Sequence, residues 1–434
     1  MNPGHRTAIV VGAGQAGLSM SHCLTRRGID HVVLEKNRVG AEWRDRRWDS
    51  FCLVTPNWQC DLPGFPYTGT DPHGFMPRDE IVAYLEDYAR SFAVPLREGV
   101  TAQRLQDSRD GTFRLETDHG EWTAEHVVIA TGPYQVPLTP RIAERLPEHV
   151  VQLHSTDYRN PAQLPDGPVL VVGTGQSGCQ IAEDLHLAGR EVHLAVGSAP
   201  RVARRYRGQD VVDWLEDMGY YRRSIDEFAD AEAVRLRANH YVTGRDGGHD
   251  IDLRAFALDG MRLYGRLTDI SGGHLRFADD LATNLDHADQ VSESIKDSID
   301  GFIASQGIDT PTEDRYVPVW QPGAPADLPV DGIAAVVWAT GFGRDNRWID
   351  VPVFDGKGYP VHHRGVTTRP GLYFLGLPWQ WTWGSGRFCG VAADAEYLAN
   401  RIATRQVFEV PWLGGTAAST WPSDHEWVAP RTVA

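Results

Sequence analysis

The sequence lacks the features that define several common classes of protein. Only five cysteines occur in 434 residues, and they form no C-x-x-C pair and have no histidine neighbours at zinc-ligand spacing. No apolar run approaches the roughly 20 residues of a membrane-spanning helix, and no signal-peptide pattern precedes the first apolar segment. We therefore expect a cytoplasmic protein with reduced thiols, no metal site and no membrane contact.

Positive charge is also scarce. The chain has 42 Lys and Arg against 58 Asp and Glu, a formal net charge of −16, which would repel the phosphate backbone of a nucleic acid. The phosphate loop G-x-x-x-x-G-K-[ST], the nucleophile elbow G-x-S-x-G and the zinc motif H-E-x-x-H are all missing. A nucleic-acid partner and the common kinase, hydrolase and metalloprotease functions are therefore not expected.

The chain does have a glycine-rich turn near its start. The apolar run Thr7–Val11 is followed by Gly12-Ala-Gly-Gln-Ala-Gly17, by an amphipathic stretch to Gly28, and by the apolar run His31–Glu35. This order predicts strand, turn, helix and strand. The first glycine permits the tight turn, the second lets a diphosphate approach the backbone, and the third lets the helix pack against the strand. Glu35 is placed to accept hydrogen bonds from a ribose 2′-hydroxyl.

The same unit occurs a second time in the chain. Val169–Val172 leads into Gly173-Thr-Gly-Gln-Ser-Gly178, a helix to about Gly189, and a strand over Glu191–Val196. A single glycine pattern is weak evidence, but its repetition with both strands and the helix predicts two dinucleotide sites. In the second copy Val196 takes the position of the carboxylate that ends the first copy.

Arginines follow the second unit. The segment from Ser198 to Arg207 contains Arg201, Arg204 and Arg205 in an otherwise acidic protein. Loss of the carboxylate and gain of guanidinium groups suits a ribose 2′-phosphate. The first site is therefore predicted to bind FAD and the second NADPH; the alternative for these arginines is a solvated basic turn.

Further motifs resemble the class B flavin-dependent monooxygenases, which are flavoproteins with two dinucleotide-binding domains. These motifs are Val127-Val-Ile-Ala-Thr-Gly132, Val336-Val-Trp-Ala-Thr-Gly341, Leu372-Tyr-Phe-Leu-Gly376, Gly40-Ala-Glu-Trp43-Arg44 and His154-Ser-Thr-Asp-Tyr158-Arg159. The match is nearest to bacterial flavoproteins of the cation-transport-associated type and to plant auxin-forming monooxygenases. The first half of the family fingerprint departs, since Glu148 replaces an aromatic residue and Val150 a glycine.

The resemblance implies an α/β fold with two Rossmann-like dinucleotide-binding domains, the NADPH domain inserted into the FAD domain. We expect residues 1–144 and 331–434 to form the two parts of the FAD domain, and residues 145–330 to form the NADPH domain. Residues 215–320 carry few motifs. The residues expected to bind the two cofactors are Gly12, Gly14, Gln15, Ala16, Gly17, Glu35, Lys36, Trp43, Arg44, Val100, Thr131, Gly132, Gly173, Gly175, Gln176, Ser177, Gly178, Ser198, Arg201, Arg204, Arg205, Gly341 and Ser385.

The resemblance also implies a reaction. Family members reduce FAD with NADPH, form a C4a-peroxyflavin with dioxygen and insert one oxygen atom into a small organic substrate. Heteroatom or carbon oxygenation is the first hypothesis. The alternatives are a Baeyer-Villiger monooxygenase of ketones and a non-enzymatic flavoprotein that senses NADPH and regulates a transporter. A disulfide reductase would need a redox-active cysteine pair, and Cys52 and Cys60 lack that spacing.

Asn57 is the candidate catalytic residue. Family members often carry an asparagine near the peroxyflavin, shortly before a segment like Leu62-Pro-Gly-Phe-Pro66, and Asn57 has that place here. The alternative is an asparagine that caps a local turn.

Two tryptophan-rich segments leave alternatives open. Trp379, Trp381 and Trp383 would either line an aromatic substrate cavity or pack between domains or subunits, for example in a homodimer. The tail after Val410 would wrap over the body or over a neighbouring subunit. Gly244–Asp250 is predicted to be a structured turn, not a metal site.

Overall fold

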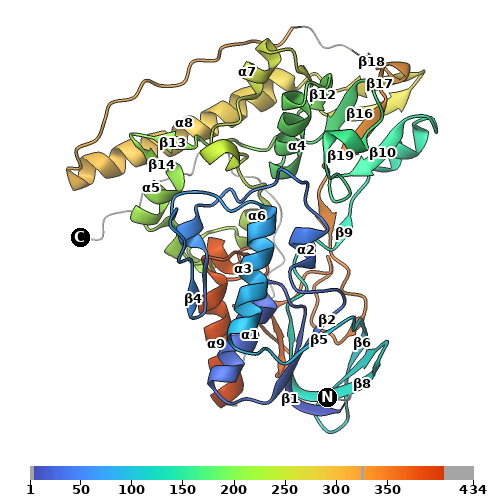
Figure 1. Cartoon of the computed structure of the whole chain (residues 1–434), viewed down its shortest axis with the longest axis vertical. Coiled ribbons are helices and arrows are strands. Elements are labelled where there is room, and N and C mark those ends of the chain that lie inside the picture. Colours follow the sequence, from blue (N-terminus) through green and yellow to red (C-terminus); the bar gives the residue numbers. More distant parts are fainter. Residues whose placement is uncertain (1–3, 324–326, 405–434) are drawn as a thin grey trace.

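The computed structural model describes residues 4–323 and 327–404. The chain folds into two lobes joined by a waist, with the N-terminus in the lower lobe of Figure 1. Each lobe is built around a sheet with parallel central strands. The tail after Val410 lies outside the described residues.

The first lobe contains a ten-stranded sheet. Its strands are β1 (His5–Val11), β2 (His31–Glu35), β5 (Leu96–Glu98), β6 (Ala102–Asp107), β7 (Phe113–Thr117), β8 (Gly120–Ile129), β21 (Ile349–Asp350), β22 (His362–His363), β23 (Val366–Thr367) and β24 (Leu372–Phe374). The main path runs β21-β6-β7-β8-β1-β2-β5, with β24 beside β8. The pairings among β24, β8, β1, β2 and β5 are parallel. The sheet therefore joins segments from both ends of the chain.

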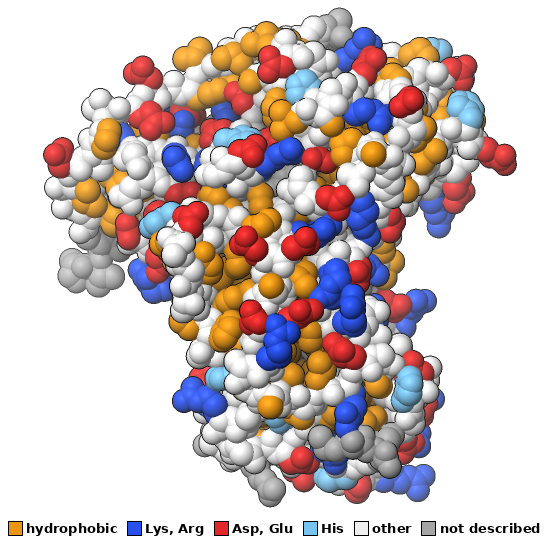
Figure 2. Space-filling view, in the orientation of Figure 1, with side chains coloured by type: hydrophobic (Ala, Val, Ile, Leu, Met, Phe, Trp, Pro, Cys, Tyr) orange, Lys and Arg blue, Asp and Glu red, His pale blue; other side chains and the backbone are white. Residues whose placement is uncertain are grey.

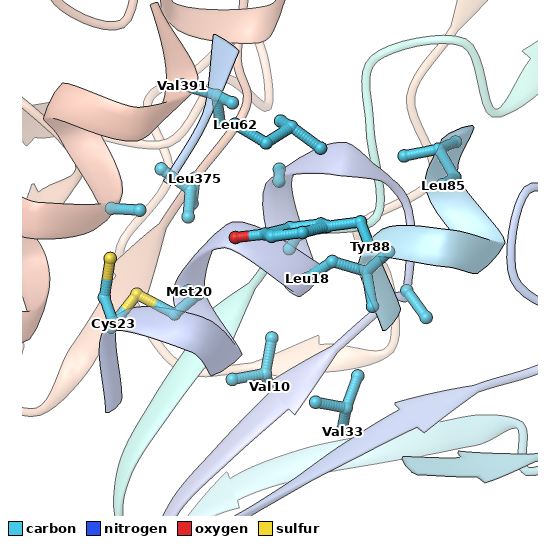
Figure 3. Packing of buried hydrophobic residues seen from close by; sticks show 14 of the residues in the cluster. Val10, Leu18, Met20, Cys23, Val33, Leu62, Leu85, Tyr88, Leu375 and Val391 are labelled. Atoms are coloured by element: carbon cyan, nitrogen blue, oxygen red, sulfur yellow. The ribbon is translucent and has the colours of Figure 1, made fainter. Parts of the chain in front are cut away.

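Both faces of this sheet are buried because successive side chains point to opposite faces. Val10 and Val33 face the helices α1 (Gln15–Arg26), α3 (Arg78–Ser91) and α9 (Val391–Thr404). Figure 3 shows the Tyr88 ring of α3 beside Leu18 of α1, with Val10 and Val33 on the strands beneath. Ile9 and the other residues of these strands that point to the opposite face join a second buried cluster, formed with β6, β7 and the segment after β21.

The second lobe contains a five-stranded, fully parallel sheet in the order β10-β19-β11-β12-β15. These strands are β10 (Val151–His154), β11 (Val169–Val172), β12 (Val192–Ala195), β15 (Arg262–Tyr264) and β19 (Ala335–Trp338). Helix α4 (Gln176–Leu187) packs on one face, where its side chains join those of Val169 and Val171 in a buried cluster. The predicted α/β fold with two Rossmann-like sheets is confirmed.

Other elements surround these sheets. The further helices are α2 (Ala41–Arg44), α5 (Val211–Asp217), α6 (Ala231–Leu236), α7 (Leu253–Leu258) and α8 (Leu281–Gln306). The further strands are β3 (Asp61–Leu62), β4 (Phe65–Pro66), β9 (Val136–Pro137), β13 (Arg205–Tyr206), β14 (Gln209–Asp210), β16 (Leu267–Ser271), β17 (His274–Phe277), β18 (Leu328–Pro329) and β20 (Phe342–Gly343). In the described part of the chain, no helix combines the length and hydrophobicity needed to cross a bilayer.

Candidate functional site

The first glycine-rich turn has the geometry of a diphosphate cradle. Gly12 ends β1 at a φ of +105°, and a Cβ atom there would lie 2.5 Å from the carbonyl oxygen of Ala130. A Cβ atom on Gly17 would lie 1.8 Å from the oxygen of Gly12. A Cβ atom on Gly14, in contrast, would meet no atom within 4 Å. Two glycines are therefore required by packing, and the third faces open space, as the close approach of a diphosphate to the backbone would require.

The second turn repeats this geometry. Gly173 ends β11 at a φ of +105°, with its Cβ position 2.6 Å from the oxygen of Ala339. The Cβ position of Gly178 lies 1.9 Å from the oxygen of Gly173, whereas that of Gly175 is open. Ala130 and Ala339 each belong to an Ala-Thr-Gly motif, so these motifs supply the backbone that excludes a side chain at the first glycine of each turn.

Both cradles also present the free end of a helix. Helix α1 begins after Gly14 and α4 after Gly175, and neither N-cap has a side-chain hydrogen bond or an acidic residue in the first turn. The first N–H groups of a helix have no partner within the helix and carry a partial positive charge. Each cradle therefore suits the negative charge of a dinucleotide diphosphate.

The two copies differ at the strand that follows. The Glu35 carboxylate ends β2 and accepts hydrogen bonds of 2.8 Å from the backbone N–H groups of Ala13 and Asn37. At the matching position Val196 is buried and apolar. There the hydroxyl of Thr174 accepts a hydrogen bond of 2.9 Å from the N–H of Gly197. A hydroxyl thus ties the second turn to its strand, and no negative charge stands at this point.

The other residues predicted for the first cofactor lie around the first cradle. Gln15 Nε2 donates to the carbonyl of Gly386 at 3.1 Å. The Trp43 ring stacks on Phe388 at a centroid distance of 5.7 Å. Of the remaining residues, Ser385 and Val100 are buried, whereas Lys36 is exposed. Thr131 and Gly132 accept hydrogen bonds from Gln135, and Arg44 pairs with Glu86 at 2.5 Å. Ala16 packs against Gly376. The segment 376–388 thus closes over the start of α1.

The three arginines after the second unit differ in their burial and in their partners. Arg201 is buried and pairs with Asp289 at 2.6 Å. Arg204 is buried, pairs with Asp210 at 2.5 Å and donates to the carbonyl of Val54 at 2.6 Å. Only Arg205 is exposed, with a single hydrogen bond of 3.5 Å to the carbonyl of Gly247. The first two guanidinium groups are therefore paired with carboxylates of the protein, and Arg205 is the exposed cation of the three.

The remaining predicted positions of the second site vary in exposure. Gln176 Nε2 donates to the carbonyl of Val242 at 2.5 Å. Ser177 is half-buried at the start of α4, and Ser198 is exposed after β12. Gly341 lies at the crossing between the lobes, and its carbonyl accepts a hydrogen bond of 3.1 Å from His154. These residues therefore lie between the second glycine-rich turn and the waist of the molecule.

Both polar atoms of the Asn57 side chain form hydrogen bonds with the backbone of a neighbouring loop. Its Oδ1 accepts from the N–H of Met76 at 2.7 Å, and its Nδ2 donates to the carbonyl of Asp71 at 2.9 Å. These bonds fasten the 71–76 loop, which matches the alternative of local capping. Gln59, on the same short 3₁₀ turn, is 2% exposed, and both atoms of its amide lack a partner. Sequence patterns gave no signal for Gln59, although its unpaired amide suits a bound polar group.

The three clustered indoles pack against the segment 220–234. Trp379 contacts Tyr220 and Phe228 with centroid distances of 6.3 and 5.2 Å, and Trp383 contacts Tyr221 at 4.6 Å. Trp381 lies beside them in the same apolar cluster. Of the two interpretations, these contacts favour packing between parts of the chain.

One carboxylate connects three segments at the junction of the lobes. Asp184 of α4 accepts hydrogen bonds from the Ser50 hydroxyl at 2.6 Å, the Tyr158 hydroxyl at 2.7 Å and the Arg245 guanidinium at 3.0 Å. Next to it, Glu183 pairs with His249 at 2.6 Å, and burial raises the pKa of Glu183. The Gly244–Asp250 loop is thus a structured turn, and no metal-binding group of three side chains occurs among the described residues.

The five cysteines are free thiols, four of them buried. Burial raises the pKa of Cys52 and of Cys389 to about 11, and that of Cys60 to about 12. Thiols of this kind are protonated at neutral pH and are weak nucleophiles.

Comparisons with known proteins agree with this geometry. Residues 9–250 match the family model described as pyridine nucleotide-disulphide oxidoreductase. An uncharacterized CzcO-like oxidoreductase of Geobacillus kaustophilus is 36% identical over 91% of this chain and 97% of its own. The indole-3-pyruvate monooxygenase YUCCA1 of Oryza sativa is 33% identical over 46% of this chain and 49% of its own. The flavin-containing monooxygenase of Stenotrophomonas maltophilia, at 21% identity, has the same fold with a TM-score of 0.65, covering 93% of this chain and 99% of that one.

Proposed function

This chain belongs to the pyridine nucleotide-disulphide oxidoreductase family, and from this premise we propose that it is an FAD- and NADPH-dependent monooxygenase. Its substrate is a small organic molecule, into which it inserts one oxygen atom of dioxygen. Oxygenation of a heteroatom or of carbon is preferred over insertion next to a ketone. The chain is thus an oxidoreductase by family, and its cofactors and reaction are the proposal.

The observation that carries the proposal is the pair of matched cradles with unlike strand ends. Gly14 and Gly175 leave the same open space in front of an uncapped helix. Glu35 offers a carboxylate to a ribose hydroxyl at the first cradle, whereas Val196 leaves the second without an acid. Two dinucleotides of different chemistry fit this arrangement.

The residues of this chain would bind and orient the cofactors, and the cofactors would supply hydride transfer and oxygen activation when bound. The N–H groups at the starts of α1 and α4 would hold the diphosphates. Gln15 and the segment 376–388 would enclose the flavin end of FAD and keep water away. Arg205 is the exposed cation that would meet the 2′-phosphate of NADPH, since Arg201 and Arg204 are paired with carboxylates.

The thiols support oxygenation over disulfide reduction. A disulfide reductase needs a thiolate beside the flavin, and burial raises the pKa of Cys52, Cys60 and Cys389. These three cysteines are free. Chemistry that depends on the cofactor without help from a protein thiol is therefore favoured.

Isotopically labelled dioxygen tests the proposal. The purified protein would be given NADPH, labelled dioxygen and a panel of amines, thioethers, aromatic acids and ketones, and products would be analysed by mass spectrometry. We expect one labelled oxygen atom in a heteroatom or carbon product. A labelled ester or lactone would instead indicate the Baeyer-Villiger alternative. NADPH oxidation that yields only hydrogen peroxide with every compound would contradict the proposal and favour the sensor alternative.

A further inference from the structure

An arginine at the waist has no carboxylate partner. Arg47 is partly buried between the rings of Trp43 and Phe51, with its guanidinium carbon 5.4 and 5.8 Å from their centroids. Its Nη1 donates to the carbonyl of Arg46 at 2.8 Å. Within the described residues no carboxylate lies within 4 Å of it. The aromatic faces hold this cation in place but do not neutralise it.

Two further guanidinium groups share the turn 45–47. Arg159 donates to the carbonyls of Thr156 and Tyr158 at 2.8 and 2.9 Å, and also to that of Asp45. Arg46 pairs with Glu42 at 3.5 Å, while its Nη1 is buried without a partner. Glu42 pairs with Arg46, the exposed Asp45 belongs to the turn itself, and Asp49 interacts electrostatically with Arg159. Among the described residues, Arg47 is therefore the cation of the three whose guanidinium has neither an ion pair nor a bond to a distant carbonyl.

A partly buried guanidinium without an ion pair, such as that of Arg47, is stabilised when an anion from outside the chain binds it. Removing a cation from water costs free energy that an opposite charge must offset. Burial lowers the pKa of Arg47, and the neighbouring Arg46 and Arg159 act in the same direction, while Glu42 opposes the shift from a distance. The Thr156 hydroxyl near Arg159 is also buried and lacks a partner. The turn therefore offers several unused donors.

The turn lies between the two cradles. Trp43 stacks on Phe388, which belongs to the segment that closes over α1. Trp48, one residue after Arg47, packs in the cluster around α4. Figure 2 shows Lys and Arg side chains together with Asp and Glu side chains at the waist of the molecule, where Figure 1 places α2. Arg47 thus lies in a segment that contacts both the 376–388 segment and the apolar cluster of the second lobe.

We propose that Arg47, assisted by Arg46 and Arg159, binds a phosphate group of a dinucleotide held in one of the cradles. A guanidinium fixed in its plane by two aromatic rings offers a pair of parallel donors to phosphate oxygens. The phosphate comes from FAD or from the nicotinamide dinucleotide, and these two sources are separated below. The proposal rests on the proposed function only in that a dinucleotide occupies a cradle.

The substitution Arg47→Met tests this, because Met keeps the length and the contact with both rings but removes the charge. Dissociation constants for FAD and for NADP⁺ would be measured by calorimetry on the full chain, together with the thermal midpoint without added dinucleotide. We expect one of the two constants to rise about tenfold to a hundredfold, the range for losing a charge-assisted hydrogen bond. The midpoint of the ligand-free chain should stay equal or rise, since an unbalanced cation has been removed.

The controls separate this role from a structural one. Arg109→Met removes the same charge from an exposed loop and should change neither constant. Arg47→Lys keeps the charge without the planar pair of donors and should weaken the same dinucleotide by a smaller factor. A rise for FAD identifies its diphosphate, and a rise for NADP⁺ identifies the other source. If both constants stay within twofold of the unsubstituted protein in Arg47→Met, or in Arg47→Lys should the Met variant not fold, the proposal is wrong. Both constants are measurable even if no oxygenation occurs.

Discussion

The two cradles predict opposite effects for chemically identical substitutions. A methyl group added at Gly14 enters open space, and the extended backbone there, with a φ of −77° and a ψ of −173°, accepts alanine. A methyl group added at Gly17 would lie 1.8 Å from the oxygen of Gly12, a distance that forces the backbone apart. Gly14→Ala should therefore disturb the ligand, and Gly17→Ala should disturb the protein.

The magnitudes follow from these contacts. Overpacking of this kind costs about 1–3 kcal/mol or more, so Gly17→Ala should lower the free energy of unfolding by at least that amount. Gly14→Ala should change it by less than about 1 kcal/mol, because the poorer N-cap and the less flexible unfolded chain offset each other. The same methyl group would occupy the space of a diphosphate and should raise the FAD dissociation constant at least tenfold, about 1.4 kcal/mol.

The second cradle provides the crossed control. Gly175→Ala should leave flavin retention unchanged and raise the dissociation constant for NADP⁺ at least tenfold, whereas Gly178→Ala should destabilise the fold. The assays are urea unfolding of the flavin-free chain, flavin retained on purification, and calorimetric titration with each dinucleotide. If Gly14→Ala and Gly175→Ala both bind their dinucleotides as tightly as the unsubstituted protein, the turns are structural and the assignment of two cofactor sites fails.

Substitutions at four further residues probe charged and titratable groups, with His363 as a control. Arg204→Ala should cost about 3 kcal/mol of stability in urea unfolding, because the largely buried carboxylate of Asp210 loses its cation and keeps the N–H of Val212. Arg205→Ala should leave stability within about 0.5 kcal/mol but raise KM for NADPH severalfold without raising that for NADH, and equal losses would contradict a role at the 2′-phosphate. Glu35→Gln should weaken FAD retention about tenfold, as a neutral amide replaces the ribose-facing carboxylate; unchanged flavin content would contradict this. Burial lowers the pKa of His362 to about 3, so below about pH 6.5 this imidazole is protonated in the unfolded chain but not in the folded one. Up to about 2 kcal/mol of stability should therefore be lost between neutral pH and pH 5. His362→Gln should reduce that loss, whereas the same change at the exposed His363 should not.

Local sequence was sufficient for the parts of the fold that depend on local interactions. The strand predicted over His31–Glu35 has those bounds, as does the one over Val169–Val172. Their alternation of β-branched residues and the glycines that follow act within one strand and one turn. Helix α8 was not anticipated because its apolar positions are sparse and its buried residues include Asn284, Ser292 and Lys296.

The candidate site was less predictable because partners come from distant segments. Asp289, which neutralises Arg201, lies on α8, and the carbonyl of Val54 that binds Arg204 lies in the other lobe. No spacing rule connects these residues. The unpaired amide of Gln59 likewise becomes visible only when the packing around it is known. The cofactor roles of the individual residues remain predictions that the substitutions above address.

The Asp184 carboxylate has a mechanical consequence. Its three partners are Ser50, before the 71–76 loop, Tyr158, and Arg245, in the loop after Thr243. One side chain of α4 therefore holds three separate segments of the connection together. These three hydrogen bonds help to fix the connection between the lobes at α4. Under the proposed function, the rings of two dinucleotides held in separate lobes must meet, and their alignment would then depend on the contacts of Asp184.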